Sequence, residues 1–97
     1  MRLEVKLVDL DGRQCLGLVL DLGGAPLVIV RARRGYAACG YLNREVAEKL
    51  GDTVVVVTGV RSVEEMLDKP VAWASSKARE LGVKPGMKCR EALKRMS

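Results

Sequence analysis

The chain has 97 residues, of which 48% are hydrophobic and 30% are charged, with a formal net charge of +5 and neither histidine nor phenylalanine. This length fits one domain, and the composition is that of a globular chain rather than a disordered one. No apolar run approaches the ~20 residues that a membrane-spanning helix needs, so we expect a cytoplasmic protein without a membrane partner.

The cysteine content argues against a disulfide framework and against a metal site. Cys15, Cys39 and Cys89 are an odd number of cysteines and lie far apart in the sequence. Widely spaced, odd cysteines are not typical of a disulfide-stapled domain. Zinc sites are built mostly from histidine and closely spaced cysteine pairs, and the chain has neither. We therefore expect no metal and no cofactor.

The N-terminal third of the chain predicts a β meander. Charged and apolar residues alternate from Arg2 to Val8, which is typical of a half-buried strand. Asp11-Gly12 predicts a two-residue hairpin turn, because both positions of that turn need a positive φ. The returning strand, from about Gln14 to Leu22, is apolar on both faces. We expect another subunit to cover one of these faces.

The middle of the chain predicts a strand–helix–strand unit. Leu27–Val30 is a continuous apolar run, typical of a central buried strand, and Tyr36–Cys39 can pair back on it. Asn43 is a favoured N-cap for a helix over residues 44–50, and Gly51 stands where a helix-ending glycine belongs. The β-branched run Thr53–Val57 predicts a second buried strand directly after the helix.

The C-terminal third predicts three short helices and one short strand. Ser62 and Glu65 form a capping box at the start of a helix that Pro70 ends. Residues 71–74 predict a short strand, and Ser75 or Ser76 can cap the helix that follows it. The last helix is amphipathic, with apolar residues at helical spacing at Cys89, Ala92, Leu93 and Met96.

These elements predict a single α/β domain over residues 1–97, with an α+β character. The expected order is β-β-β-β-α-β-α-β-α-α, with a mixed sheet and helices mainly in the C-terminal half. Residues 1–34 form the β-rich part, and residues 35–97 form the α/β part, which contains the strand–helix–strand unit.

The positive charge is concentrated at the C-terminal end. Residues 1–76 carry ten basic and ten acidic side chains, whereas residues 77–97 carry seven basic and two acidic ones. Such asymmetry can mark a surface that binds nucleic acid, with Lys88, Arg90, Lys94 and Arg95 as the candidate contacts. A solvated basic helix face is the simpler interpretation.

Several segments resemble a known prokaryotic family. In chain order they are "APLVIVRARRGYAACGYLN", "AEKLGD", "VTGVRSVEEML", "ARELGVKPGM" and "REALKRM". Their order and spacing over residues 25–96 are similar to those of the YunC-like family, prokaryotic domain of unknown function 1805. The resemblance implies a small α/β protein whose N-terminal β region, here residues 1–34, serves tetramerisation. It implies no reaction.

The stretch "GYAACGYLN", from Gly35 to Asn43, is the candidate site. Two glycines separated by four residues between a strand and a helix suggest a phosphate loop, but Tyr41 and Leu42 replace its Lys and Ser/Thr. Nucleotide triphosphate hydrolysis is therefore rejected. A small anionic ligand remains a hypothesis, with the candidate binding residues Gly35, Tyr36, Gly40, Tyr41, Asn43 and Arg44.

Cys39 is the candidate nucleophile of the same stretch. A nearby arginine can lower the pKa of a thiol, but the chain has no histidine to act as a base. A buried structural cysteine is the competing interpretation.

Three hypotheses for the function therefore stay open. The first is a homo-oligomeric protein, a dimer or tetramer, that binds a small anion and has no demonstrable enzymatic activity. The second is a nucleic-acid or protein interaction module that uses the basic C-terminal helices. The third is a cysteine-dependent enzyme at Cys39.

Overall fold

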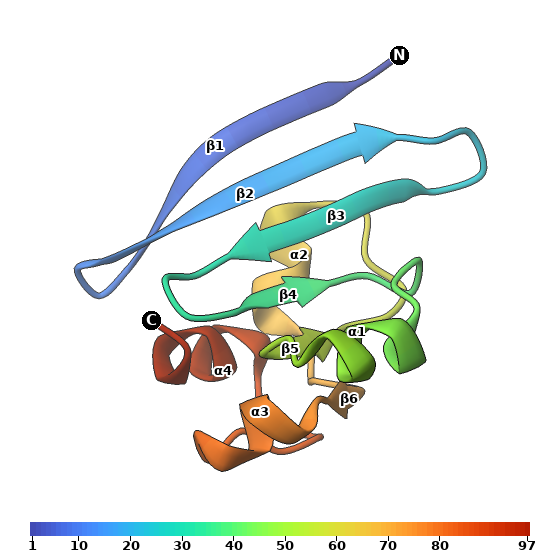
Figure 1. Cartoon of the computed structure of the whole chain (residues 1–97). Coiled ribbons are helices and arrows are strands. Elements are labelled where there is room, and N and C mark those ends of the chain that lie inside the picture. The colour runs from blue at the N-terminus through green and yellow to red at the C-terminus, as the bar shows by residue number, and fades with distance from the viewer.

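Six strands and four helices follow one another in the order predicted from the sequence, and the computed structural model describes all 97 residues (Figure 1). The strands are β1 (Leu3–Leu10), β2 (Arg13–Asp21), β3 (Pro26–Arg31), β4 (Tyr36–Ala38), β5 (Val54–Val56) and β6 (Trp73–Ala74). The helices are α1 (Arg44–Leu50), α2 (Val63–Asp68), α3 (Ser76–Glu80) and α4 (Cys89–Arg95). Three of the four helices follow β5, so the helices lie mostly in the C-terminal half, as predicted.

All six strands belong to one mixed sheet, in which they lie side by side in chain order. Neighbouring strands are antiparallel except for β4 and β5, which are parallel and are joined through α1. A parallel pair needs such a crossover, whereas antiparallel neighbours can be joined by tight turns. The β1–β2 turn is one of these, with φ of 55° at Asp11 and 87° at Gly12. The predicted hairpin and strand–helix–strand unit are both confirmed.

The ends of α1 follow the predicted capping chemistry. The Asn43 side chain accepts a hydrogen bond from the backbone N–H of Val46 at 3.1 Å, and Gly51 ends the helix with a φ of 74°. Glycine adopts this left-handed conformation without steric cost. Of the apolar residues of α1, only Ala47 is buried, whereas Val46 and Leu50 are exposed.

The start of α2 differs slightly from the predicted capping box. Ser62 Oγ accepts from the N–H of Glu65 at 3.1 Å, as expected. The Glu65 carboxylate, however, accepts from the N–H of Arg61 at 2.7 Å rather than from that of Ser62. The helix ends at Asp68, because the residue before Pro70 is restricted to extended backbone, and Lys69 has φ −92° and ψ 157°.

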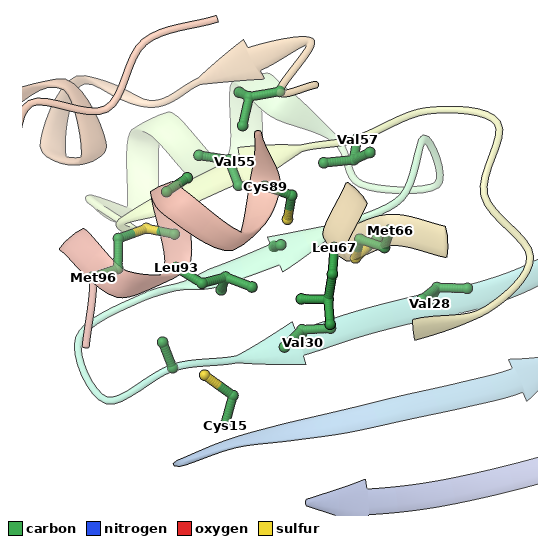
Figure 2. Packing of buried hydrophobic residues seen from close by; sticks show 14 of the residues in the cluster. Cys15, Val28, Val30, Val55, Val57, Met66, Leu67, Cys89, Leu93 and Met96 are labelled. Carbon is green, nitrogen blue, oxygen red and sulfur yellow. The ribbon is translucent and has the colours of Figure 1, made fainter. Parts of the chain in front are cut away.

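The main core lies between one face of the sheet and the helices α2 and α4 (Figure 2). Its largest fully buried side chains from the helices are Met66, Leu93 and Met96. They pack against alternate strand residues such as Val28 and Val30 of β3 and Val55 of β5. The apolar residues predicted for one face of the last helix, such as Leu93 and Met96, are therefore buried as expected.

A second, smaller packed region lies on the other face of β4 and β5, where α1 lies (Figure 1). Ala38, Val54 and Val56 are buried but stand apart from the main cluster, because neighbouring strand residues point to opposite faces. Only this part of the sheet therefore has helices on both faces.

The outer face of β1, β2 and part of β3 is apolar and has no cover. We call it the outer apolar face, and its side chains are those of Leu3, Val5, Leu7, Leu16, Leu18, Leu20 and Ile29. Cross-strand pairing aligns them in rows, for example Val5 opposite Leu18 and Leu18 opposite Ile29. Leu3, Val5 and Leu7 are 64%, 61% and 69% exposed.

The inner face of the same strands carries the polar side chains of β1. Lys6 forms an ion pair with Glu64 of α2, and Gly17 of β2 leaves room for Val63 of α2. The alternation in β1 is thus as predicted, but its polar side is turned toward the helices. None of the four helices has the length and apolar character needed to span a bilayer.

Candidate functional site

A pocket of about 400 Å³ lies at the edge of the sheet where β3 begins and β4 ends. Three segments that are distant in sequence form it: the start of β3, the turn after β4, and the loop between β5 and α2. The lining residues are Ala25, Pro26, Cys39, Gly40, Tyr41, Gly59, Val60 and Arg61. The pocket therefore contains part of the candidate stretch and a loop that sequence reasoning did not connect with it.

Local hydrogen bonds fix the turn that forms one wall of this pocket. The Cys39 backbone N–H donates to the Val28 carbonyl at 3.1 Å, and the N–H of Leu42 donates to the Cys39 carbonyl at 3.2 Å. The Tyr41 hydroxyl donates to the Ala25 carbonyl at 3.1 Å, which ties the turn to the loop before β3. The wall is therefore held by backbone contacts on both sides.

The polar groups of the pocket are mainly unpaired donors. The backbone N–H groups of Gly40, Tyr41, Gly59 and Val60 make no hydrogen bond within the protein. The guanidinium group of Arg61 has no carboxylate partner and no hydrogen-bond acceptor in the protein. Unbonded N–H groups and a positive charge along one pocket provide a favourable environment for an anion.

Cys39 is held as a structural residue. It is 4% exposed, and its sulfur accepts a weak hydrogen bond from the N–H of Val28 at 3.4 Å. No carboxylate, lysine or histidine lines the pocket. A thiol nucleophile needs both access to its substrate and a group that favours the thiolate, and this thiol is almost completely buried and has no base beside it. The geometry thus offers no support for the cysteine-enzyme hypothesis.

Gly35 and Tyr36 lie at the opposite end of β4 from this pocket. Gly35 is packed so closely that a Cβ atom there would stand 2.5 Å from the Thr53 carbonyl oxygen. The Tyr36 hydroxyl donates to the Asp52 carboxylate at 2.5 Å. Burial, together with this hydrogen bond to Asp52, raises the pKa of Tyr36 to about 12. Gly35 is therefore required by close packing, and Tyr36 is held by its hydrogen bond to Asp52.

Asn43 and Arg44 lie in a third place, at the start of α1. Asn43 caps the helix, and the Arg44 guanidinium stacks 5.8 Å from the ring centre of Trp73. This contact borders a shallow surface hollow that Glu45 and Glu48 also line. The structure therefore divides the predicted site residues among three places, and only Cys39, Gly40 and Tyr41 line the pocket.

The segment that contains this site also carries the family signal. The family model "Domain of unknown function (DUF1805)" matches residues 38–96. The chain belongs to the DUF1805 family. The match includes the pocket residues Cys39, Gly40, Tyr41 and Arg61, but not Ala25 or Pro26.

Two DUF1805-like proteins match almost the whole chain. The uncharacterized protein YunC of Bacillus subtilis (strain 168) is 32% identical over 93 residues, which cover 92% of each chain. A crystal structure of TA1206 from Thermoplasma acidophilum, a protein of unknown function, superposes with a TM-score of 0.95. That match has 34% identity and covers 99% of this chain and 94% of the other. The N-terminal meander is therefore part of the similarity, which extends beyond the residues 25–96 that carried the resemblance in the sequence.

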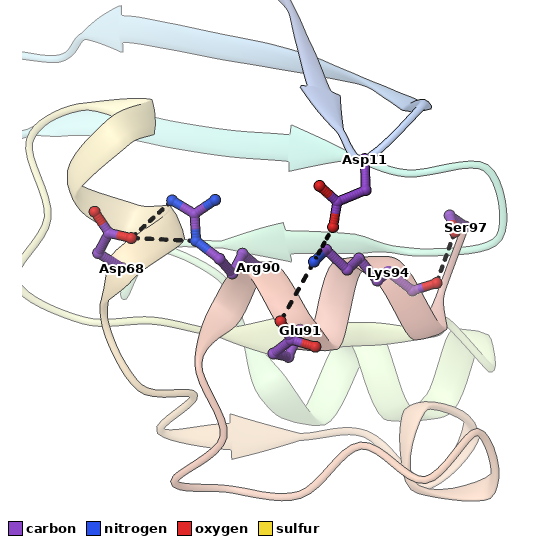
Figure 3. Close-up of polar contacts among 6 residues, drawn as sticks. All are labelled: Asp11, Asp68, Arg90, Glu91, Lys94 and Ser97. Atoms are coloured by element: carbon purple, nitrogen blue, oxygen red, sulfur yellow. Dashed lines mark hydrogen bonds and ion pairs between the residues drawn. The ribbon is translucent and has the colours of Figure 1, made fainter.

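The basic residues at the C-terminal end of this DUF1805 chain are partly neutralised. Arg90 pairs with Asp68 at 2.7 Å, and Lys94 pairs with Asp11 at 2.5 Å and with Glu91 at 3.4 Å (Figure 3). The hydrogen bond from Lys94 lowers the pKa of Asp11 and raises the pKa of Lys94 itself. Two of the four cations considered for nucleic-acid binding are thus engaged within the protein.

The pocket residues that sequence reasoning missed include Gly59, Val60 and Arg61 of the loop between β5 and α2. They carry no motif, and their loop lies about twenty residues beyond Cys39 in the sequence. Only the parallel pairing of β4 with β5 brings the ends of these two strands to the same edge of the sheet. No group of three or more cysteine, aspartate or glutamate side chains in this chain is arranged to hold a metal ion.

Proposed function

We propose that the protein is a homo-oligomer that binds a small anionic ligand in the pocket beside Gly40, Tyr41 and Arg61. One observation carries the ligand-binding part of the proposal. Four residues with unbonded backbone N–H groups, together with Arg61, whose guanidinium is unpaired, line one pocket of about 400 Å³. An anion held there would satisfy donors that the protein itself leaves open.

The walls suggest the form of this anion. Pro26, Val60 and the ring of Tyr41 give the pocket apolar sides, and Arg61 is its only charged residue. A ligand with one carboxylate or phosphate and a small apolar body fits this pocket. Its charged group would contact Arg61, and its apolar body would contact the apolar sides. No reaction is proposed, because no acid–base pair lines the pocket.

The ligand-binding proposal is tested by amide chemical-shift titration of the intact protein with butyrate and with inorganic phosphate. We expect shifts at Gly40, Tyr41, Gly59 and Val60, and at least a ~10-fold loss of affinity in Arg61→Gln. Arg44→Gln, which removes the same charge outside the pocket, is the matched control and should bind as the unmodified protein does. Shifts scattered over the surface, or no shifts at these amides, would overturn the proposal.

The proposed oligomer assembles through the outer apolar face. The seven aliphatic side chains stand in adjacent rows and form one continuous apolar patch. Stable monomers rarely expose an apolar patch of this size. Two such faces can pack as a sheet-on-sheet sandwich about 10 Å thick. Asp9 and Arg31, of opposite charge, lie on the same side of the sheet at one end of this face. This arrangement suits association with a second copy, because each surface then offers both charges.

Size-exclusion chromatography with light scattering tests the assembly. We expect a dimer or tetramer for the unmodified protein and a folded monomer for Val5→Glu/Leu18→Glu. Leu50→Glu is the control, because Leu50 is 72% exposed but lies on α1, away from the outer apolar face. Circular dichroism establishes that the variants are folded. A monomeric unmodified protein at micromolar concentration would contradict this assembly.

We also propose a cytoplasmic location. The support is the state of the thiols, since Cys15, Cys39 and Cys89 are all unpaired and buried. Small proteins in oxidising compartments commonly use their cysteines in disulfides instead.

A further inference from the structure

Two adjoining hollows lie at the opposite end of the sheet from the pocket of the proposed function. They have volumes of about 440 and 350 Å³, and Arg13 and Ser97 line both of them. Arg34, Lys94 and Arg95 complete the basic lining of the first hollow, and Arg33 lines the second. The β1–β2 turn, the β3–β4 turn and the end of α4 meet here, and Figure 1 shows all three on the same side of the molecule.

Arg34 is the residue that brings these three segments together. Its Nε donates to the Ser97 carbonyl at 3.2 Å, and its Nη2 donates to the Arg95 carbonyl at 2.9 Å. Its backbone N–H donates to the Met96 carbonyl at 2.7 Å. Arg34 therefore fixes the end of α4 to the β3–β4 turn and is committed to a structural role.

The remaining charges of the cluster are unbalanced. Lys94 is paired with Asp11 and Glu91 (Figure 3). The guanidinium groups of Arg13, Arg33 and Arg95, by contrast, have neither a carboxylate nor a hydrogen-bond partner. Arg95 lies over Gly82, where a Cβ atom would stand 2.9 Å from its Nη1. Like charges held close together repel, so an anion that enters the cluster relieves this repulsion.

We propose that this cluster binds a small ligand with at least two linked phosphate groups. Arg13 lines both hollows, together with Arg33 in one and Arg95 in the other. The planar guanidinium group matches the paired oxygens of a phosphate better than any other side chain does. Two adjoining hollows that share one arginine suit two neighbouring phosphates of a di- or triphosphate.

The rest of the lining indicates that the cluster recognises the phosphate groups of its ligand and not a nucleobase. No aromatic side chain borders either hollow, so nothing is placed to stack on a nucleobase. Leu81 is the only apolar residue of the lining. The cluster therefore differs in chemistry from the mainly apolar pocket at the other end of the sheet.

Isothermal titration calorimetry of the intact protein with tripolyphosphate tests the proposal. We expect saturable binding that weakens with rising salt, and at least a ~10-fold loss of affinity in Arg13→Gln/Arg33→Gln. Lys77→Gln/Lys84→Gln removes the same charge at two other exposed positions and should change the affinity by no more than about twofold. Equal losses in the two double variants would overturn the proposal, because they would reduce it to a general charge effect.

Two further measurements identify the ligand class and separate this site from the first one. Adenosine triphosphate should bind within about threefold of tripolyphosphate, and orthophosphate should bind more weakly than either. Adenosine triphosphate binding that is tighter by ~100-fold would overturn recognition through phosphates alone, as would tight binding to duplex RNA without tripolyphosphate binding. Arg61→Gln should leave tripolyphosphate binding unchanged, so failure at one site is distinguishable from failure at the other.

Discussion

The hydroxyl of Ser75 holds the backbone of Val54, a residue twenty-one positions earlier in the chain. Ser75 Oγ accepts a hydrogen bond from the N–H of Val54 at 3.0 Å and another from the N–H of Ala78 at 3.3 Å. Ser75 is completely buried and is the only buried polar side chain in the protein. One oxygen therefore caps α3 and also satisfies a donor at the start of β5.

Removal of this oxygen should lower the free energy of unfolding by more than the loss of an ordinary helix cap does. Ser75→Ala loses the cap, which is worth about 1 kcal/mol, and leaves the buried N–H of Val54 unpaired, which costs about 1–3 kcal/mol more. We expect urea unfolding to report a loss of about 2–4 kcal/mol. Ser62→Ala, which removes only a half-exposed cap, should cost about 1 kcal/mol. Equal losses in the two variants would contradict this role of Ser75.

Gly35 should not tolerate a side chain, for reasons of space alone. A Cβ atom would lie 2.5 Å from the Thr53 carbonyl oxygen and 2.8 Å from the Met96 sulfur. Relief of these contacts requires a shift of β5 or α4, so Gly35→Ala should cost at least ~2 kcal/mol in chemical unfolding. Gly24→Ala is the control, because nothing lies within 4 Å of a Cβ there. It should change stability by less than about 0.5 kcal/mol.

The raised pKa of Tyr36 should be visible by titration. The pKa of Tyr36 is raised to about 12 by burial and by the hydrogen bond to Asp52. The neutral phenol thus stabilises the fold fully below pH ~10, and this contribution is lost as the pH rises through about 12. In Tyr41→Phe, the ultraviolet absorbance of tyrosinate should rise with a midpoint near 12 while circular dichroism remains native. A midpoint near 10 in the folded variant would refute the assignment.

The ion pair between Asp11 and Lys94 should give a stability difference that depends on pH. The hydrogen bond from Lys94 lowers the pKa of Asp11, so the charged form stabilises the fold at neutral pH. That contribution is lost as the pH falls below ~4 and through the lowered pKa. Asp11→Asn, which keeps the positive φ accessible, should be less stable than the unmodified protein at pH 7.

The stability difference caused by Asp11→Asn should narrow at acidic pH and at high salt, as thermal unfolding can measure. In the Lys94→Gln background, the stability difference caused by Asp11→Asn should depend much less on pH, because Lys94 is the main cause of the lowered pKa of Asp11. A difference that stays constant from neutral to acidic pH would show that the substitution acts on the turn and not on the ion pair.

The order and types of the elements were predictable because their signals are local. The Asp11-Gly12 turn, the Asn43 and Ser62 caps and the Gly51 helix end act on neighbouring backbone groups. Their effects do not depend on the rest of the fold. The uniformly apolar run from Val54 to Val56 likewise predicted a strand that is completely buried.

The candidate site was predictable only in part, because its residues come from three separate segments. Gly40 and Tyr41 were named from the sequence, and they do line the pocket. Arg61 joins them only because β4 and β5 are parallel and end at the same edge of the sheet. Gly35 and Tyr36 are close to Gly40 in sequence, but an extended strand between them carries them to its opposite end.

Local sequence patterns were thus sufficient for the elements, their order and the alternation of side chains along β1. They could not decide which side of β1 faces the helices. That side is chosen by α2, about sixty residues later, where Glu64 pairs with Lys6 and Val63 packs on Gly17. Helix propensities and helix caps depend on residues close in sequence. Which face of the sheet the helices cover, and which arginines lie together, depends instead on contacts between distant segments. For this reason the pocket beside Arg61 and the two arginine-lined hollows became visible only in three dimensions.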